Sequence, residues 1–147
     1  MTFEASNVAP ISSIAKTLSL YVNICLSKSI AVSGIYFEKL VDEAPEGLSV
    51  LRGIQMEGPY FCYAKRGAQN ADYLKEPDFE GFKKLFDGCG GLVKIVDIAP
   101  ELPGAAEFVA KAKDLCTVSI AHTDSDYDHA KAAVDAGVTH LTHLYNA

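Results

Sequence analysis

From residue 49 onward, the sequence alternates short runs rich in β-branched residues with longer stretches of helical spacing. The short runs are too apolar and too short for surface helices, so we predict that they are strands buried in a parallel sheet. Repeated strand and helix units of this kind are typical of α/β folds. The four predicted strands cover residues 49–56, 92–98, 116–121 and 138–142.

Residues that favour helix ends lie between these strands. Asp78 precedes one helical stretch, Pro103 precedes a second, and Asp124 or Ser125 precedes a third that Gly137 ends. Aspartate and serine cap helix N-termini, proline is favoured in the first turn, and glycine is common just beyond the last turn. We therefore predict one helix between each two consecutive strands.

The first 48 residues have a weaker pattern. Ser12 or Ser13 could cap a helix that runs through residues 14–22, and we predict a second helix over residues 35–41. Residues 57–77 contain glycines, prolines and several aromatic residues, which indicates a long ordered loop on the functional side of the sheet.

The composition suits one globular domain. With 147 residues, of which 49% are hydrophobic, the chain can bury a core that hides roughly 70% of the unfolded surface. We expect a single domain over residues 1–147. The net charge is -6 and the basic residues are scattered, so nucleic acid is not an expected partner.

The sequence shows no sign of a membrane span, a secretory signal or a disulfide framework. Charged and polar residues interrupt the apolar residues 11–41 before a spanning length of roughly 20 is reached. No positively charged segment precedes an apolar stretch at the N-terminus. We expect a soluble, cytoplasmic protein with no membrane partner. The cysteines are far apart without a C-x-x-C pair, which favours reduced thiols at Cys25, Cys62, Cys89 and Cys116.

Three residues with metal-binding side chains end predicted strands: Glu57, His122 and His143. Parallel sheets and barrels gather their chemistry at the carboxyl ends of strands, so the three are expected to converge. A histidine at one strand end has many structural uses, but His143 repeats the placement of His122 one unit later. Glu57 could be a surface turn acid, yet a charge that ends a buried strand is costly unless a partner such as a metal offsets it.

The two other histidines receive different assignments. His140 and His143 would lie on opposite faces of a strand, so only one of them can face the site. We assign His143, which is at the carboxyl end, and expect His140 to be packed or to face the helices. His129 lies in an amphipathic helix rich in alanine and lysine, and we expect it to be solvated.

The donor set of one carboxylate and two imidazoles favours a metal-dependent hydrolase. It suits zinc, iron or another divalent transition metal better than calcium or magnesium. Three ligands with an open fourth position are typical of catalytic zinc. The sequence has no G-x-x-x-x-G-K-[ST] P-loop and no G-x-S-x-G elbow, and residues 88–91 do not fit the dinucleotide fingerprint.

Five blocks of sequence carry a resemblance to a known family. At these blocks the chain resembles the N-acetylglucosamine-6-phosphate deacetylases of the amidohydrolase superfamily. The blocks occur in the family's order and cover about the last two-thirds of the chain, whereas the first 45 residues match weakly. The blocks are residues 55–61 (QMEGPYF), 65–70 (KRGAQN), 99–101 (APE), 121–123 (AHT) and 142–147 (THLYNA).

The resemblance implies a fold, a reaction and a cofactor. The fold would be about half of a (β/α)8 barrel, from the middle of the barrel. The reaction would be metal-dependent deacetylation of N-acetyl-D-glucosamine 6-phosphate to D-glucosamine 6-phosphate and acetate. The divalent metal would be zinc, with iron, cobalt or manganese as alternatives, and the full-length form would be a homo-oligomer.

The resemblance also implies roles for individual residues. The metal ligands would be Glu57, His122 and His143, and the sugar phosphate would lie near Ala68, Gln69, Asn146 and Ala147. Many family members have a histidine where this chain has Gln69, and glutamine can hydrogen-bond the substrate but cannot supply a positive charge. The catalytic aspartate lies on a later strand that this chain does not reach, so no catalytic residue is assigned here.

Two other interpretations stay open at this stage. Another amidohydrolase, such as a deaminase or a cyclic-amide hydrolase, would use similar ligands, although the block at residues 65–70 argues against it. A truncated, non-catalytic product could bind metal weakly or associate with a complementary piece, because a half barrel exposes strand edges and apolar surface.

Overall fold

The computed structural model describes residues 19–25 and 50–145, and its strands form one parallel sheet. The strand order in the sheet follows the order in the chain. Each strand pairs in parallel with the next. The strands are β1 (Ser19–Cys25), β2 (Val50–Tyr60), β3 (Val93–Ile98), β4 (Thr117–Ile120) and β5 (His140–Leu141).

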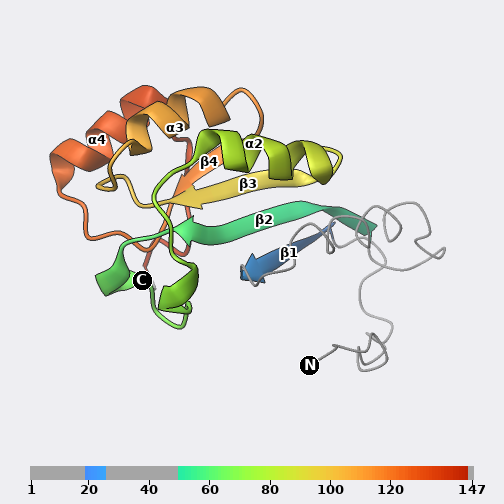
Figure 1. Ribbon diagram of the computed structural model, residues 1–147, viewed down its shortest axis with the longest axis horizontal. Coiled ribbons are helices and arrows are strands. Elements are labelled where there is room, and N and C mark those ends of the chain that lie inside the picture. The colour runs from blue at the N-terminus through green and yellow to red at the C-terminus, as the bar shows by residue number, and fades with distance from the viewer. Residues whose placement is uncertain (1–18, 26–49, 146–147) are drawn as a thin grey trace.

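Three helices connect the later strands and lie along one face of the sheet (Figure 1). They are α2 (Phe79–Gly88), α3 (Ala105–Ala112) and α4 (Tyr127–Ala136). A doubly wound sheet reverses its strand order and carries helices on both faces. Strands in chain order with helices on one face are instead what a segment of a (β/α)8 barrel presents.

The core lies between the sheet and this helical layer. Alternate strand residues, among them Val96, Ile98 and Val118, are at most 1% exposed and pack against the helices. Phe108 of α3 is the centre of an aromatic cluster, with its ring 4.9 Å from that of Tyr60 and 5.4 Å from that of Phe82. Because strand side chains alternate between faces, the intervening residues point away from the helices.

Most predicted elements are present, with shifted ends. The predicted strands at residues 92–98 and 116–121 correspond to β3 and β4 within one residue, β2 continues beyond the predicted end to Tyr60, and β5 is shorter than predicted. Asp78 caps α2 as predicted, because its side chain accepts a hydrogen bond from the Gly81 backbone N–H. Gly137 ends α4 as predicted.

The predicted helix over residues 14–22 is wrong where the structure describes it. Residues 19–25 form β1, and β1 pairs with β2 from Ser19 to Cys25. The physical reason is visible in the sequence, because Leu20, Val22 and Ile24 alternate with a period of two, which suits a strand. Pairing with a neighbouring strand outweighs the local helical spacing. The remainder of that helix and the one predicted at residues 35–41 lie outside the described residues.

The cap of α4 also differs from the prediction. The N-cap is Asp126, whose side chain accepts from the His129 backbone N–H, and not Asp124 or Ser125. The backbone N–H of Asp124 instead donates to the Glu101 carboxylate, at 2.7 Å, so Asp124 belongs to the loop before the helix. The second helix, α3, begins two residues after Pro103, and its N-cap is Gly104.

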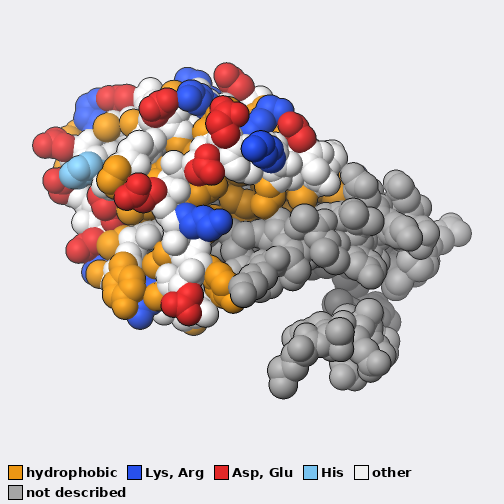
Figure 2. Space-filling model, viewed as in Figure 1, with side chains coloured by type: hydrophobic (Ala, Val, Ile, Leu, Met, Phe, Trp, Pro, Cys, Tyr) orange, Lys and Arg blue, Asp and Glu red, His pale blue; other side chains and the backbone are white. Residues whose placement is uncertain are grey.

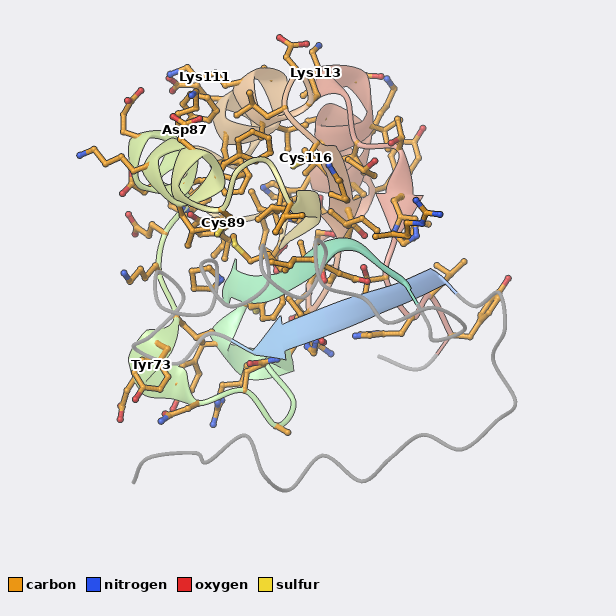
Figure 3. All side chains as sticks on the ribbon, turned by 90° about the vertical axis from the view of Figure 1, so that its right-hand side faces the viewer. Tyr73, Asp87, Cys89, Lys111, Lys113 and Cys116 are labelled. Atoms are coloured by element: carbon orange, nitrogen blue, oxygen red, sulfur yellow. The ribbon has the colours of Figure 1, made fainter. Side chains whose placement is uncertain are left out.

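The surface over the helices mixes both charge signs, as Figure 2 shows on one face. Figure 3 places Lys111 and Lys113 on the outer side of this layer and Tyr73 beyond the sheet from them. Cys89 is buried, Cys62 and Cys116 are free thiols, and burial raises the pKa of the Cys116 thiol to about 12. Among residues 19–25 and 50–145, every helix is too short or too polar to cross a bilayer.

Candidate metal centre

Glu57, His122 and His143 meet at one point beyond the sheet's carboxyl edge. Their ligand atoms all lie within 4.8 Å of one another. Glu57 is on β2 where regular pairing with β3 is interrupted, His122 follows β4, and His143 follows β5. The side chains are 16%, 12% and 30% exposed, so the cluster is shielded but reachable from solvent.

The backbone is strained at both histidines. His122 has a φ of 48° and His143 a φ of 36°, and among the described residues they are the non-glycine residues with positive φ. This left-handed conformation costs of order 1–3 kcal/mol for a residue with a side chain, and it is tolerated where the surroundings enforce it. Strain at both histidines of one cluster indicates that the orientation of their imidazole rings is maintained at a cost in local stability.

The loop after β2 holds the His122 ring from two sides. The ring nitrogen Nδ1 lies 2.8 Å from the backbone carbonyl of Lys65, which can only accept, so Nδ1 carries the hydrogen. The Phe61 ring lies 4.3 Å from the imidazole, and the Cys62 N–H donates to the His122 carbonyl. In neutral His122 the Nε2 lone pair therefore faces the cluster.

Two acceptor atoms, Glu57 Oε1 and His122 Nε2, consequently face each other, with His143 Nε2 beside them. Glu57 Oε1 lies 2.8 Å from His122 Nε2 and 3.5 Å from His143 Nε2, and the two Nε2 atoms are 3.2 Å apart. Such a contact needs a positive charge, which either a proton or a cation can supply. Two ligands of a tetrahedral zinc ion lie about 3.3 Å apart, given bonds of about 2.0–2.1 Å, so the spacing fits a divalent metal.

Beside this cluster, Glu101 fixes the loop that follows His122. Its carboxylate accepts from the Thr123 hydroxyl at 2.5 Å and from the Asp124 N–H at 2.7 Å. The Asp124 side chain forms an ion pair with Lys65 at 3.2 Å. The loops after β2, β3 and β4 are thus tied together around His122. His143 is held less completely, because its buried Nδ1 has no hydrogen-bond partner among the residues that the structure describes.

The residues that the resemblance implies for substrate binding are only partly described. Ala68 is exposed and Gln69 is half-buried, in the turn after the 3-10 helix η2 (Tyr63–Lys65). At the adjacent Gly67, a side chain would come 3.5 Å from the His122 ring, so this turn passes beside the cluster. Asn146 and Ala147 lie outside the described residues.

His140 is exposed and does not face the helices, which corrects the sequence-based prediction that it is packed or helix-facing. It pairs in register with Ser119, and its Nδ1 lies 2.9 Å from the Ser119 hydroxyl on the face away from the helices. The regular alternation that was assumed for residues 140–143 ends with β5 at Leu141. His129 is exposed, as predicted, and contacts the Asp126 carboxylate.

Sequence reasoning missed the partners of the cluster. The Lys65 carbonyl is a backbone group and has no sequence signature. Glu101 did have a sequence signature, because it lies just beyond the carboxyl end of β3, at the same edge of the sheet as the predicted metal ligands.

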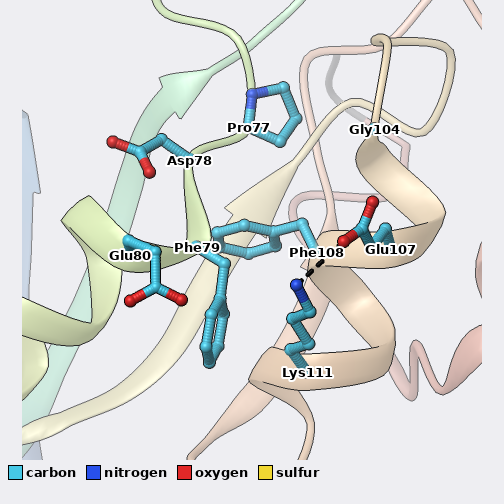
Figure 4. Close-up of a pocket in the computed structure, with 8 residues that line it drawn as sticks. All are labelled: Pro77, Asp78, Phe79, Glu80, Gly104, Glu107, Phe108 and Lys111. Atoms are coloured by element: carbon cyan, nitrogen blue, oxygen red, sulfur yellow. Dashed lines mark hydrogen bonds and ion pairs between the residues drawn. The ribbon is translucent and has the colours of Figure 1, made fainter.

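A hollow of about 230 Å³ lies elsewhere, between the start of α2 and α3 (Figure 4). Phe79 and Phe108 form part of its wall, together with Asp78, Glu80 and Glu107. Three carboxylates against the single cation Lys111, which already pairs with Glu107, do not suit an anionic ligand. The strand-end cluster is therefore the stronger candidate for chemistry.

Comparisons with known proteins point in the same direction. The N-acetylglucosamine-6-phosphate deacetylase of Bacillus subtilis (strain 168) is 42% identical over 98 residues, which are 66% of this chain and 25% of that protein. The Homo sapiens enzyme of that name is 38% identical over 107 residues, 70% of this chain and 26% of that protein. The chain is homologous to part of the N-acetylglucosamine-6-phosphate deacetylases. This confirms the resemblance found in the sequence, although no protein-family model matches.

Solved structures agree with this assignment. The deacetylase of Mycobacterium smegmatis superposes with a TM-score of 0.77 and 28% identity, over 87% of this chain and 33% of that chain. A mutant of that enzyme in complex with N-acetyl-D-glucosamine-6-phosphate gives the same TM-score at 26% identity, over the same shares of the two chains. The predicted fold class, a partial barrel of the amidohydrolase type, is confirmed. The chain spans about a quarter of the length of the curated deacetylases it matches.

Proposed function

We propose that this chain supplies the metal-binding strand ends of an N-acetylglucosamine-6-phosphate deacetylase. The whole reaction would convert N-acetyl-D-glucosamine 6-phosphate and water to D-glucosamine 6-phosphate and acetate. The observation that carries the proposal is the contact of Glu57, His122 and His143 within a segment homologous to these enzymes. We further propose zinc as the metal, a cytoplasmic location and a homo-oligomeric full-length form.

Each of the three residues would contribute one donor atom to the metal: Glu57 a carboxylate oxygen, and His122 and His143 their Nε2 atoms. A divalent metal held there would supply Lewis acidity, polarising an amide carbonyl and lowering the pKa of water. The Lys65 carbonyl would keep His122 in the tautomer that leaves Nε2 free. Phe61, whose ring is tilted against the imidazole, would limit access of water to that side.

The turn at residues 67–70 would form the substrate side of the site. Its backbone passes beside His122 at Gly67, which supports a substrate-side role for the following residues Ala68 and Gln69. Glutamine can donate to or accept from a sugar hydroxyl or a phosphate oxygen. We propose that Gln69 binds the sugar phosphate without adding charge, and that Asn146 and Ala147 complete this side.

The direct test is acetate release from N-acetylglucosamine 6-phosphate by the protein that this locus encodes, with bound metal measured by elemental analysis. We expect turnover that Glu57→Gln abolishes, and no turnover of nucleobases or dihydroorotate. We also expect the 147-residue chain alone to bind metal without turnover, because the resemblance assigns proton transfer to an aspartate that it lacks. Turnover of dihydroorotate or a nucleobase instead would move the protein to another amidohydrolase activity.

A further inference from the structure

A group of polar side chains lies on the sheet face away from the helices, beneath the candidate metal centre. Asp97 of β3 is fully buried, with 0% exposure. Its carboxylate accepts from the Thr142 hydroxyl at 2.9 Å and from the Gln55 side-chain amide at 3.2 Å. The Ser119 hydroxyl lies 2.7 Å from that of Thr142, and His140 Nδ1 lies 2.9 Å from Ser119.

When Asp97 is ionised, its carboxylate sets the direction of the hydrogen bonds that lead to it from Thr142, Ser119 and His140. Asp97 can only accept, so Thr142 donates to it. Ser119 must then donate to Thr142, and His140 must donate to Ser119 through Nδ1. These bonds form one directed series that ends at Asp97, and the Gln55 amide joins it at both Asp97 and Thr142. A satisfied polar network of this kind favours one arrangement of its strands.

The chain of hydrogen bonds connects two strands that do not pair with each other. Gln55 precedes Glu57 by two residues on β2, and Thr142 precedes His143 directly after β5. Two strands, β3 and β4, separate β2 from β5 in the sheet. Gln55 and Thr142 nevertheless both bind Asp97, and the Gln55 amide also lies 3.1 Å from the Thr142 hydroxyl.

We propose that Asp97 is a positioning residue that sets the spacing between Glu57 and His143 by holding Gln55 and Thr142. The inference rests on the proposed metal centre and deepens it. His143 depends on such support because its own Nδ1 has no partner among the described residues and its backbone is strained. A carboxylate without a cationic partner in a buried layer is costly for the fold. Burial accordingly raises the pKa of Asp97, although the bonds from Thr142 and Gln55 act in the opposite direction.

The test titrates Co²⁺ into the full chain and follows its visible absorption, which reports both affinity and ligand geometry. The variants are Asp97→Asn, Thr142→Val and the conservative Thr142→Ser, which keeps the hydroxyl. Asp87→Asn is the matched control, because it removes an exposed carboxylate whose ion-pair partner among the described residues is Lys83 on α2. Thermal unfolding without metal measures the fold separately.

We expect Asp97→Asn and Thr142→Val to weaken Co²⁺ binding about 10- to 100-fold, the usual effect of removing a group that orients a metal ligand, and to shift the absorption bands. Thr142→Ser and Asp87→Asn should resemble the unmodified chain. Unchanged affinity and spectrum in Asp97→Asn and Thr142→Val would overturn the inference. So would loss of the fold in both variants, since the network would then serve the fold alone. No Co²⁺ binding by the unmodified chain would instead refute the metal centre itself, and the inference with it.

Discussion

The two faces of the parallel sheet are made from neighbouring residues of the same strands, yet they differ in chemistry. On the helix-covered face, Val96 and Val118 pack in an apolar core. One residue later in each strand, Asp97 and Ser119 are buried in a hydrogen-bonded layer. Apolar packing depends on area and volume, whereas hydrogen bonds demand direction and distance. The comparison indicates that one face sets the stability of the fold and the other sets the geometry of the site.

The largest expected effect on stability lies on the apolar face. Phe108→Ala removes a ring that is 2% exposed and contacts Tyr60 and Phe82. We expect it to lower the free energy of unfolding by about 3–5 kcal/mol. Denaturant titration measures this, with Tyr127→Ala as control, since that ring is 76% exposed. Equal losses in the two variants would contradict the central place of Phe108 in the core.

The next largest effect separates the site from the fold. His122→Ala should lower metal affinity by more than about 100-fold, because even groups that only orient a ligand are worth about 10- to 100-fold. The metal-free unfolding free energy should change far less than in Phe108→Ala. Isothermal titration with zinc gives the affinity, and His129→Ala, at an exposed histidine on α4, is the control. The two-face comparison fails if both histidine variants bind zinc equally.

A smaller effect is expected at the loop that supports His122. Glu101→Gln keeps the size of the side chain but removes the carboxylate that binds the Thr123 hydroxyl and the Asp124 N–H. Hydrogen bonds to a charged group are worth about 1.5–3 kcal/mol, so we expect a loss of stability near the lower end and a modest loss of zinc affinity. Glu107→Gln, on the exposed face of α3, should leave zinc binding unchanged. Identical zinc affinity in Glu101→Gln and Glu107→Gln would show that Glu101 does not support the metal site.

The smallest effect is a pH dependence on the helical side. Hydrogen bonds from the His129 backbone and side chain lower the pKa of Asp126, the cap of α4. Because the folded value lies below the unfolded one, its stabilisation is complete above about pH 4 and is lost as the pH falls through the folded value. Asp126→Asn keeps a capping side chain without titrating. Between about pH 5 and pH 2, the unfolding temperature should therefore fall more steeply in the unmodified chain than in Asp126→Asn. Parallel curves of unfolding temperature against pH would contradict this.

Much of the architecture could be predicted from the sequence, because strand and helix periods and helix caps are local signals. The later strands and the ends of α2 and α4 at Asp78 and Gly137 are examples. Residues 19–25 could not be assigned correctly, because both periods are present there and pairing with β2 decides between them. The cap at Asp126 could not be chosen over Asp124 because three neighbouring residues, Asp124, Ser125 and Asp126, all have capping side chains, and the contact of the Asp124 N–H with Glu101 is not local.

The candidate site shows the same division. Glu57, His122 and His143 could be selected because strand ends and residue types are written in the sequence, and their role as metal ligands stays a prediction. Their supports could not be selected, since the Lys65 carbonyl is a backbone atom and the bond between Asp97 and Thr142 joins residues 45 positions apart. Such contacts exist only after the sheet has formed.

Crystals grown with zinc, analysed by anomalous diffraction at the zinc edge, would test the central claim most directly. The account predicts one strong peak with Glu57 Oε1, His122 Nε2 and His143 Nε2 each at about 2.0–2.2 Å. The absence of a peak between these three atoms, or a peak held by other residues, would contradict it.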